Sequence, residues 1–194
     1  MFATGVRYKM ESVSLPRTIE NPLVKDRVTF LTTAAESEGK FELVKVELAP
    51  GGGTGLHYHL TFAEHFEAVE GELHVEVDGV FRTLRPGDTA TALPGTLHRF
   101  FNPGADPIVF RVTIDPARNF ERMLRIGYGI SRDGRVNPKN GMPYSLLEAA
   151  VIFKLGETYM ARIPIWLQRG VFGLLYNIAR KRGVEERLIQ RYCR

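Results

Sequence analysis

The sequence contains very little cysteine and tryptophan. Cys193 is the single cysteine among 194 residues, and Trp166 is the single tryptophan. One cysteine cannot form an intrachain disulfide, so a buried core must hold the fold together, and a reducing compartment is compatible. The beginning of the chain also lacks the apolar leader of a secretory signal, because Arg7, Lys9 and Glu11 interrupt it. We therefore expect a cytoplasmic protein.

Internal repeats are absent as well, so the chain is expected to hold one folding unit and not a tandem pair. Charge is present in both signs but is unevenly distributed. Residues 1–115 contain 11 Lys+Arg and 16 Asp+Glu, whereas residues 116–194 contain 15 and 6. The net charges are therefore −5 and +9, and the overall charge of +4 belongs to the C-terminal part.

Residues 27–115 have the pattern of an all-β domain. Short runs of alternating apolar and polar residues, such as 41–48 and 73–77, are separated by turn signals such as Asp78-Gly79. Regular short strands of this kind are typical of a closed barrel. Residues 1–26 show little periodicity and contain two prolines, so we expect an N-terminal arm before the barrel.

Four potential metal ligands lie in the middle of the chain. His57 and His59 are two residues apart, so in an extended strand they project from the same face. Glu64 follows five residues later, and His98 comes from a distant strand that is entered through a proline-glycine turn. Three imidazoles and one carboxylate suit a divalent transition metal such as Fe, Mn, Ni, Co, Cu or Zn, and leave one or two coordination positions open.

The spacing around these residues resembles the two motifs of the cupin superfamily. The first motif reads Gly51-x5-His57-x-His59-x4-Glu64-x6-Gly71, and the second reads Gly87-x5-Leu93-x-Gly95-x2-His98-x3-Asn102. Leu93 stands where the family usually has proline, but His98 keeps its distance from Gly95, so we expect the turn to form. The resemblance implies a mainly β protein, a cupin-type antiparallel β-barrel or jelly roll, with a metal in its mouth held by the three histidines and Glu64.

These residues also have simpler interpretations. A lone histidine on a strand is more often a core or surface residue than a ligand. Four correctly spaced residues together favour a metal site over a barrel that keeps them without a metal. Two roles stay open for Glu64, as a metal ligand or as a catalytic general base. His65 and His74 are predicted to point to other faces of their strands and are left out of the site.

Residues 116–194 are predicted to form a C-terminal helical extension. We expect a helix over 117–126, a polar loop over 134–143 and a second helix that is capped by Ser145 and Glu148. A third helix starts after Pro164 and ends before Gly183, with basic residues in its last turn. The predicted apolar stripe of the second helix comprises Leu146, Leu147, Ala150, Val151 and Leu155.

The third helix is apolar around most of its circumference. We expect its apolar side chains to pack on the outside of the barrel or on a second subunit, and we expect a homodimer. Arg169 interrupts the stretch, so it does not reach the ~20 apolar residues of a membrane span, and association of its basic end with a membrane surface is a less favoured alternative. The scattered arginines, without a recognised motif, argue against nucleic-acid binding. The apolar side chains are Trp166, Leu167, Val171, Leu174 and Ile178.

The expected function is that of a metal-binding cupin. Such a site favours a metal-dependent dioxygenase or isomerase that acts on a small oxygen-rich or aromatic molecule. Phe66 shares a strand face with Glu64, and Phe100 shares one with His98, so both rings are predicted to line the substrate pocket. The alternative is a non-catalytic protein that binds or senses a small molecule, which leaves open whether the chain is an enzyme.

Overall fold

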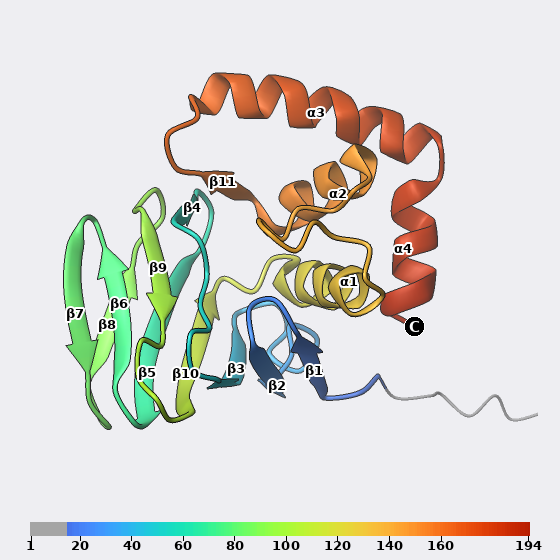
Figure 1. Cartoon of the computed structure of the whole chain (residues 1–194). Helices are drawn as coiled ribbons and strands as arrows, with labels where there is room; N and C mark the ends of the chain where they lie inside the picture. The colour runs from blue at the N-terminus through green and yellow to red at the C-terminus, as the bar shows by residue number, and fades with distance from the viewer. Residues whose placement is uncertain (1–14) are drawn as a thin grey trace, which may run out of the picture.

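Two antiparallel β-sheets lie on one side of the molecule, and helices occupy the other side (Figure 1). The computed structural model describes residues 15–194, so residues 1–14 of the expected N-terminal arm lie outside the described part. The first sheet contains β1 (Thr18–Asn21), β2 (Asp26–Thr32), β3 (Glu42–Leu48), β10 (Ile108–Asp115), β5 (Ala63–Glu70) and β8 (Thr89–Ala92), in that order. The second contains β11 (Thr158–Met160), β4 (His57–His59), β9 (His98–Phe101), β6 (Leu73–Val77) and β7 (Val80–Leu84).

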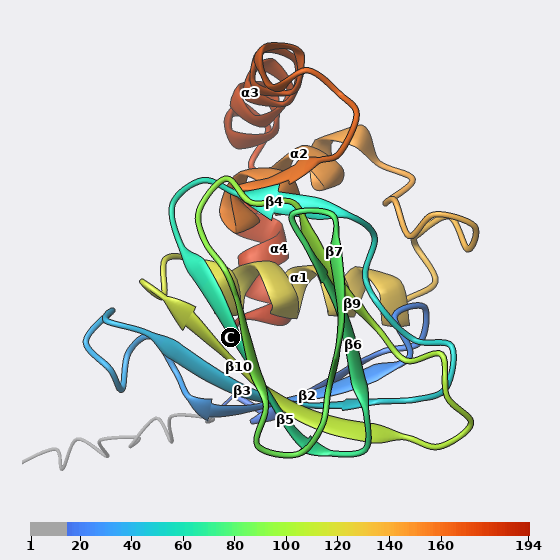
Figure 2. The same cartoon turned by 90° about the vertical axis from the view of Figure 1, so that its left-hand side faces the viewer.

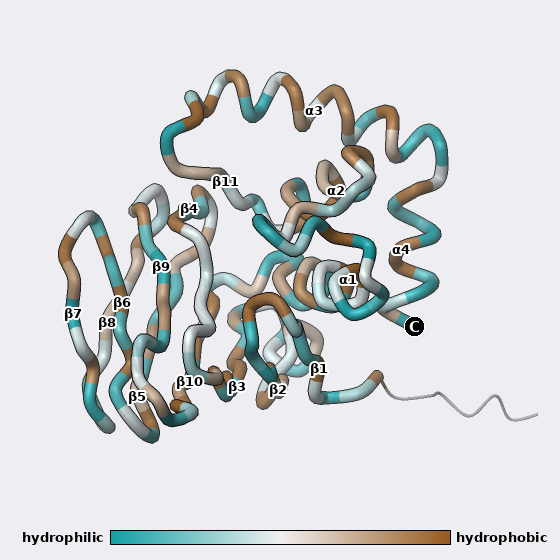
Figure 3. The backbone as a smooth tube through the Cα atoms, in the orientation of Figure 1, coloured by the Kyte–Doolittle hydropathy of each residue, from teal (hydrophilic) through white to brown (hydrophobic). Residues whose placement is uncertain are grey.

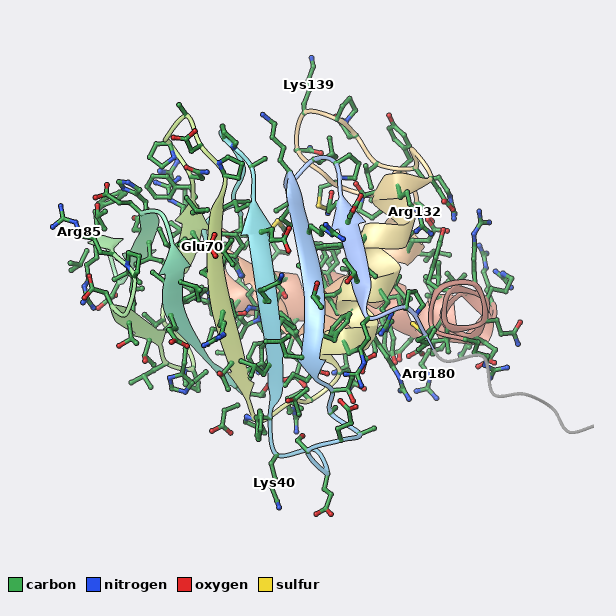
Figure 4. The ribbon with its side chains drawn as sticks, turned by 90° about the horizontal axis from the view of Figure 1, so that it is seen from below. Lys40, Glu70, Arg85, Arg132, Lys139 and Arg180 are labelled. Atoms are coloured by element: carbon green, nitrogen blue, oxygen red, sulfur yellow. The ribbon has the colours of Figure 1, made fainter. Side chains whose placement is uncertain are left out.

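The strands bury alternate residues, as the period of two predicts. In β3, Val44, Val46 and Leu48 are buried, whereas the residues between them are partly exposed. Charged side chains point away from the sheets at the rim of the molecule, for example Lys40 and Arg85 (Figure 4). The predicted mainly β fold of the jelly-roll type, followed by C-terminal helices, is confirmed.

Helix α1 (Phe120–Arg132) connects the sheets to the other helices. Phe120, Leu124 and Tyr128 recur every four residues and pack into the core between the sheets. Ile126 and Ile130 lie on another face of the helix and belong to a second core, which the helices form among themselves. Helices α1, α2 (Leu146–Gly156) and α3 (Ile165–Lys181) lie one above another, with α3 farthest from the sheets (Figure 2).

The predicted bounds of the first helix, 117–126, were wrong at both ends. Arg118 has a positive φ of 54°, which is incompatible with a helix, and α1 begins at Phe120. The helix then continues past Ile126, through Gly127 and Gly129, and ends at Arg132. At Gly129 a side chain would lie 2.3 Å from the Tyr192 ring, so glycine at this position lets α4 (Val184–Tyr192) pack closely on α1.

Helix α2 begins at the predicted cap. The Glu148 backbone N–H donates a hydrogen bond of 3.4 Å to Ser145 Oγ. The predicted apolar stripe was wrong at its first residue, because Leu146 is 63% exposed while Ala149 is fully buried. Neither α4 nor the short strand β11 was predicted.

The apolar side chains of α3 do not pack on the barrel. Trp166 is 72% exposed and Leu174 is 64% exposed, and Leu167 and Val171 are also exposed. Hydrophobic and hydrophilic residues alternate along this helix (Figure 3). Of the two expected partners, the outside of the barrel is therefore wrong, because α3 packs on α2 and α4 and lies away from the sheets, and packing on a second subunit stays a prediction. None of the helices within residues 15–194 combines the length and apolarity required to span a membrane.

Candidate metal centre and its cavity

The structure brings all four predicted ligand residues together. His57 and His59 lie on β4, and His57 is directly opposite His98 of the neighbouring strand β9. Glu64 lies on β5 of the other sheet. One ligand atom from each of the four residues lies within 4.8 Å of the others. His59, Glu64 and His98 are buried, whereas His57 is partly exposed.

The turn before His98 forms despite the leucine at position 93. Gly95 has a positive φ of 85°, and its N–H donates a hydrogen bond of 2.6 Å to the His59 carbonyl. Leu93 itself is 61% exposed, so its side chain does not have to fit into the core. The glycine and not the missing proline therefore controls this turn, because the left-handed region strongly favours glycine.

Each histidine ring is oriented by a backbone carbonyl. The Nδ1 atom lies 2.7 Å from the Gly55 oxygen in His57, and 2.9 Å from the Thr96 oxygen in His98. A carbonyl can only accept, so each Nδ1 carries the hydrogen and each Nε2 keeps its lone pair. Such a partner for the second ring nitrogen is a regular feature of metal-binding histidines.

The His59 ring is also oriented by a backbone carbonyl, but this carbonyl comes from a remote part of the chain. Its Nδ1 donates to the carbonyl of Gly156, at the end of α2, over 3.0 Å. Gly156 belongs to neither sequence motif, so local spacing did not indicate its contact with the site. Strand β11 also pairs with β4, so that Thr158 lies opposite His59. On the other side, the Phe62 ring stacks on the His59 ring with centroids 4.2 Å apart.

The charges in the cluster favour an ionised carboxylate facing neutral and protonatable imidazoles. Burial opposes ionisation of Glu64, but the neighbouring imidazoles of His59 and His98 hold its pKa well below the usual value. Burial disfavours the charged form of His98, yet the Glu64 carboxylate raises its pKa. Desolvation, together with the imidazoles of His98 and His59, lowers the pKa of His57 to about 3. His57 is therefore neutral near pH 7, which is the form that ligates metals.

The donor set fits a divalent ion. His59 Nε2 is buried and has no hydrogen-bond partner among residues 15–194, with Glu64 Oε1 3.5 Å away. His98 Nε2 lies 3.2 Å from the other oxygen, Glu64 Oε2. A buried nitrogen without a partner is costly, and an ion between the imidazoles and the carboxylate would satisfy it. The cluster can bind a metal such as those expected from the ligand types, and the geometry does not select one of them.

A cavity of about 530 Å³ opens beside the cluster. His57, His59 and Glu64 line it, and Phe100 lines it as predicted. Phe66 is not among its lining residues. It is 1% exposed and packs in the core, with its ring centroid 6.1 Å from that of Phe100. The opposite wall comes from the helical part and includes Phe120, Met123, Leu124, Ile152 and Phe153.

The two remaining histidines lie outside the cluster, as predicted. His65 is exposed on β5, with its Nδ1 2.9 Å from Thr91 Oγ1. His74 on β6 lies beside Thr83, with 3.3 Å between Nδ1 and Oγ1. The alternation of strand side chains correctly separated these residues from the ligands.

Comparisons with known proteins agree with this fold and site. Residues 44–115 match the family described as "Cupin domain". An oxidoreductase of Arthrobotrys oligospora is 27% identical over 175 residues, which cover 79% of this chain and 68% of that protein. Residues 44–115 are therefore similar to a cupin domain, and a C-terminal helical segment follows them.

Solved structures of cupins resemble parts of the chain. A sugar phosphate isomerase of the cupin superfamily from Silicibacter pomeroyi is 28% identical, covers 54% of this chain and 67% of its own, and has a TM-score of 0.43. An RmlC-like cupin from Shewanella frigidimarina is 28% identical, covers 56% of this chain and 93% of its own, and has a TM-score of 0.46.

Proposed function

We propose that the protein is a metal-dependent enzyme of the oxygenase or isomerase kind, acting on a small molecule with an oxygen-bearing end and an apolar or aromatic body. The observation that carries this proposal is the orientation of the three imidazoles. Each Nδ1 is bound to a carbonyl, so each Nε2 is the nitrogen left for an ion, and in His59 and His98 it lies 3.5 Å and 3.2 Å from the Glu64 carboxylate, at the edge of a cavity. The oxidoreductase relative supports the oxygenase branch.

A divalent ion held by His57, His59, His98 and Glu64 would supply Lewis acidity or, if redox-active, electron transfer with dioxygen. The surrounding residues shape the binding of the substrate. Phe100 lines the cavity next to the cluster, and α1 and α2 contribute its opposite wall, so that two sides of a bound molecule would be covered by protein. The low pKa of Glu64 keeps it ionised, which favours the role of ligand over that of proton donor. Proton acceptance by this carboxylate remains part of the proposal.

Elemental analysis of the purified protein, combined with oxygen-uptake and isomerisation assays on a panel of small oxygen-bearing compounds, tests this function. We expect about one divalent transition metal per chain and turnover of compounds that combine two neighbouring oxygens with an apolar body. A metal-free protein would contradict the metal site. A metal-loaded protein that binds such compounds without turnover would support the alternative function of a binding or sensing protein.

A homodimer is the second part of the proposal. The exposed apolar side chains of α3, namely Trp166, Leu167, Val171 and Leu174, form a surface that a second copy could cover. Light scattering at micromolar concentration should show a dimer, and Leu174→Ser should shift it toward monomer. Because Trp166 is the single tryptophan, its fluorescence should move to longer wavelength on dilution. A wild-type monomer with unchanged emission would contradict this arrangement.

A further inference from the structure

A second polar site lies in the wall of the cavity that adjoins the cluster. Asp26 is the first residue of β2, and it lines this cavity together with Tyr128 of α1. The Tyr128 hydroxyl donates a hydrogen bond of 2.5 Å to Asp26 Oδ2. The other carboxylate oxygen, Oδ1, is buried and accepts no hydrogen bond from the described residues. Asp26 is only 6% exposed, so this oxygen is costly unless a molecule in the cavity satisfies it.

Asp26 lies toward the end of the sheet that is remote from Glu64. In the register of the strands, Asp26 is opposite Leu48, which is opposite Ile108, whereas Glu64 is opposite Ile114. The step from Ile108 to Ile114 along β10 corresponds to roughly 20 Å in an extended strand. A ligand that reaches both the cluster and Asp26 must therefore be elongated.

The cavity wall between these two polar sites is mainly apolar. Most of its side chains come from the sheets and from α1, and the polar side chains of Thr54, Asn140 and Thr158 also line the cavity. The sheet contributes Val28, Val44, Val46 and Val112, and α1 contributes Met123 and Leu124. The body of the ligand must accordingly be mainly apolar, with its main polar groups at the two ends.

We propose that Asp26, oriented by Tyr128, binds a hydroxyl group at the far end of an elongated, mainly apolar substrate whose oxygen-bearing end faces the histidine cluster. The inference rests on the proposed function, because that function places the other end of the substrate. Tyr128 has already donated its single hydroxyl hydrogen to Asp26, so both side chains offer acceptors to the cavity when Asp26 is ionised. Acceptors of this kind select a ligand group that donates.

A hydroxyl suits this position better than an ammonium group. Burial raises the pKa of Asp26 to about 7, although the hydrogen bond from Tyr128 opposes the shift. Near neutral pH the carboxyl group is thus present in both protonation states. A hydroxyl can donate to the ionised form and accept from the protonated form, whereas an ammonium group can pair only with the ionised form.

The Asp26–Tyr128 hydrogen bond also ties α1 to the sheet, and a purely structural role would need no ligand. Two matched series of β-diketones separate the two roles. Each compound carries two oxygens for the metal and a straight alkyl chain, which ends either in a hydroxyl or in a methyl group. Binding of both series to the metal-loaded protein is measured by isothermal titration calorimetry over a range of chain lengths.

We expect the hydroxyl-ended compound to bind about tenfold more tightly than its methyl-ended partner at one chain length, the length that reaches Asp26. Asp26→Leu should abolish this preference while leaving the affinity for the methyl-ended series unchanged or higher. Asp26→Asn, which keeps polar atoms at the same place, should retain part of the preference. Thermal unfolding of each variant verifies that it is folded.

Glu42→Gln is the matched control. Glu42 is likewise a fully buried carboxylate of the same sheet with one unpaired oxygen, Oε2, but it does not line the cavity. This variant should keep the full preference for the hydroxyl. Equal binding of the two series by the wild-type protein at every length would overturn the role of Asp26 alone. Failure of both series to bind, or binding that does not need the metal, would overturn the proposed function as well.

Discussion

The three histidines of the cluster obtain the same support from two different regions of the molecule. His57 and His98 each donate to a carbonyl two residues earlier in the chain. His59 donates to the carbonyl of Gly156, which is 97 residues later. Two rings are therefore oriented by their own strands and turns, and the third is oriented by the helical segment. The comparison teaches that the helices are part of the proposed metal centre.

The helical segment supports the strands that carry the ligands through more than the single hydrogen bond from His59 to Gly156. Strand β11 adds itself to the edge of β4, the strand that carries two of the ligands. Helix α1 also fills the core between the sheets with Phe120, Leu124 and Tyr128. We infer that residues 116–194 stabilise both the sheet that presents the histidines and the orientation of His59, and that the barrel alone would lack both.

The largest expected effect comes from removing the ligands themselves. His57→Ala and His98→Ala should each reduce the metal content from about one per chain to near zero, because either change leaves an incomplete donor set. Circular dichroism should still show a folded protein. Elemental analysis of the purified variants provides the measurement. Full retention of metal in both variants would show that His57 and His98 are not ligands, whichever carbonyl orients their rings.

A second effect concerns the contact of α1 with the sheet, and it depends on pH. The Glu121 N–H at the start of α1 donates to Glu42 Oε1 over 3.2 Å. Burial, together with the charge of Glu121, raises the pKa of Glu42 to about 8, and burial raises that of Asp26 to about 7. Both carboxyls hold a proton more tightly in the folded than in the unfolded chain. These two carboxyls should therefore lower the free energy of unfolding as the pH rises from about 4 to about 8, whereas the lowered pKa of His57 acts in the opposite direction below about pH 6.5.

Urea unfolding of the wild type and of Glu42→Gln at a series of pH values measures this effect. One pKa unit corresponds to about 1.4 kcal/mol, so ionisation of Glu42 should cost the wild type several kcal/mol over the range. Glu42→Gln cannot ionise and should lose less, so the difference between the two proteins should grow in favour of the variant at high pH. If the free energies of unfolding of the two proteins changed in parallel with pH, this would contradict the raised pKa of Glu42.

A smaller effect isolates the remote hydrogen bond of His59. In Gly156→Ala the new methyl group would lie 2.8 Å from the Met123 side chain and 2.8 Å from Thr158 Oγ1, so the carbonyl must shift. Disturbing such a partner typically weakens metal binding about 10-fold to 100-fold, and we expect the lower figure. Competition with a metal chelator gives the affinity.

Gly55→Ala is the matched control for this variant. Gly55 also offers its carbonyl to a ligand, His57, but a methyl group there would meet no atom within 4 Å. We expect a metal affinity within about twofold of that of the wild type, because the added methyl group would not displace the Gly55 carbonyl from His57. Equal losses in the two glycine variants would remove the distinction between local and remote support.

Much of the candidate site was predictable because the spacing of residues in a strand determines the face on which each side chain lies. This rule placed His57 and His59 together and left His65 out. The same rule failed for Phe66, which shares a face with Glu64 but packs in the core beneath the cavity. Alternation distinguishes inside from outside, and it does not distinguish the cavity wall from the core behind it.

The sequence by itself determined the fold class, the four candidate ligands and the cap of α2, because each depends on strand alternation, turn chemistry or a hydrogen bond between residues close in the chain. Only the tertiary structure decided that Gly156 orients His59, that Tyr128 meets Asp26, and that the face of α3 stays uncovered. These contacts join segments that are far apart in the chain. Local spacing does not encode them, because they depend on how the helices pack against the sheets.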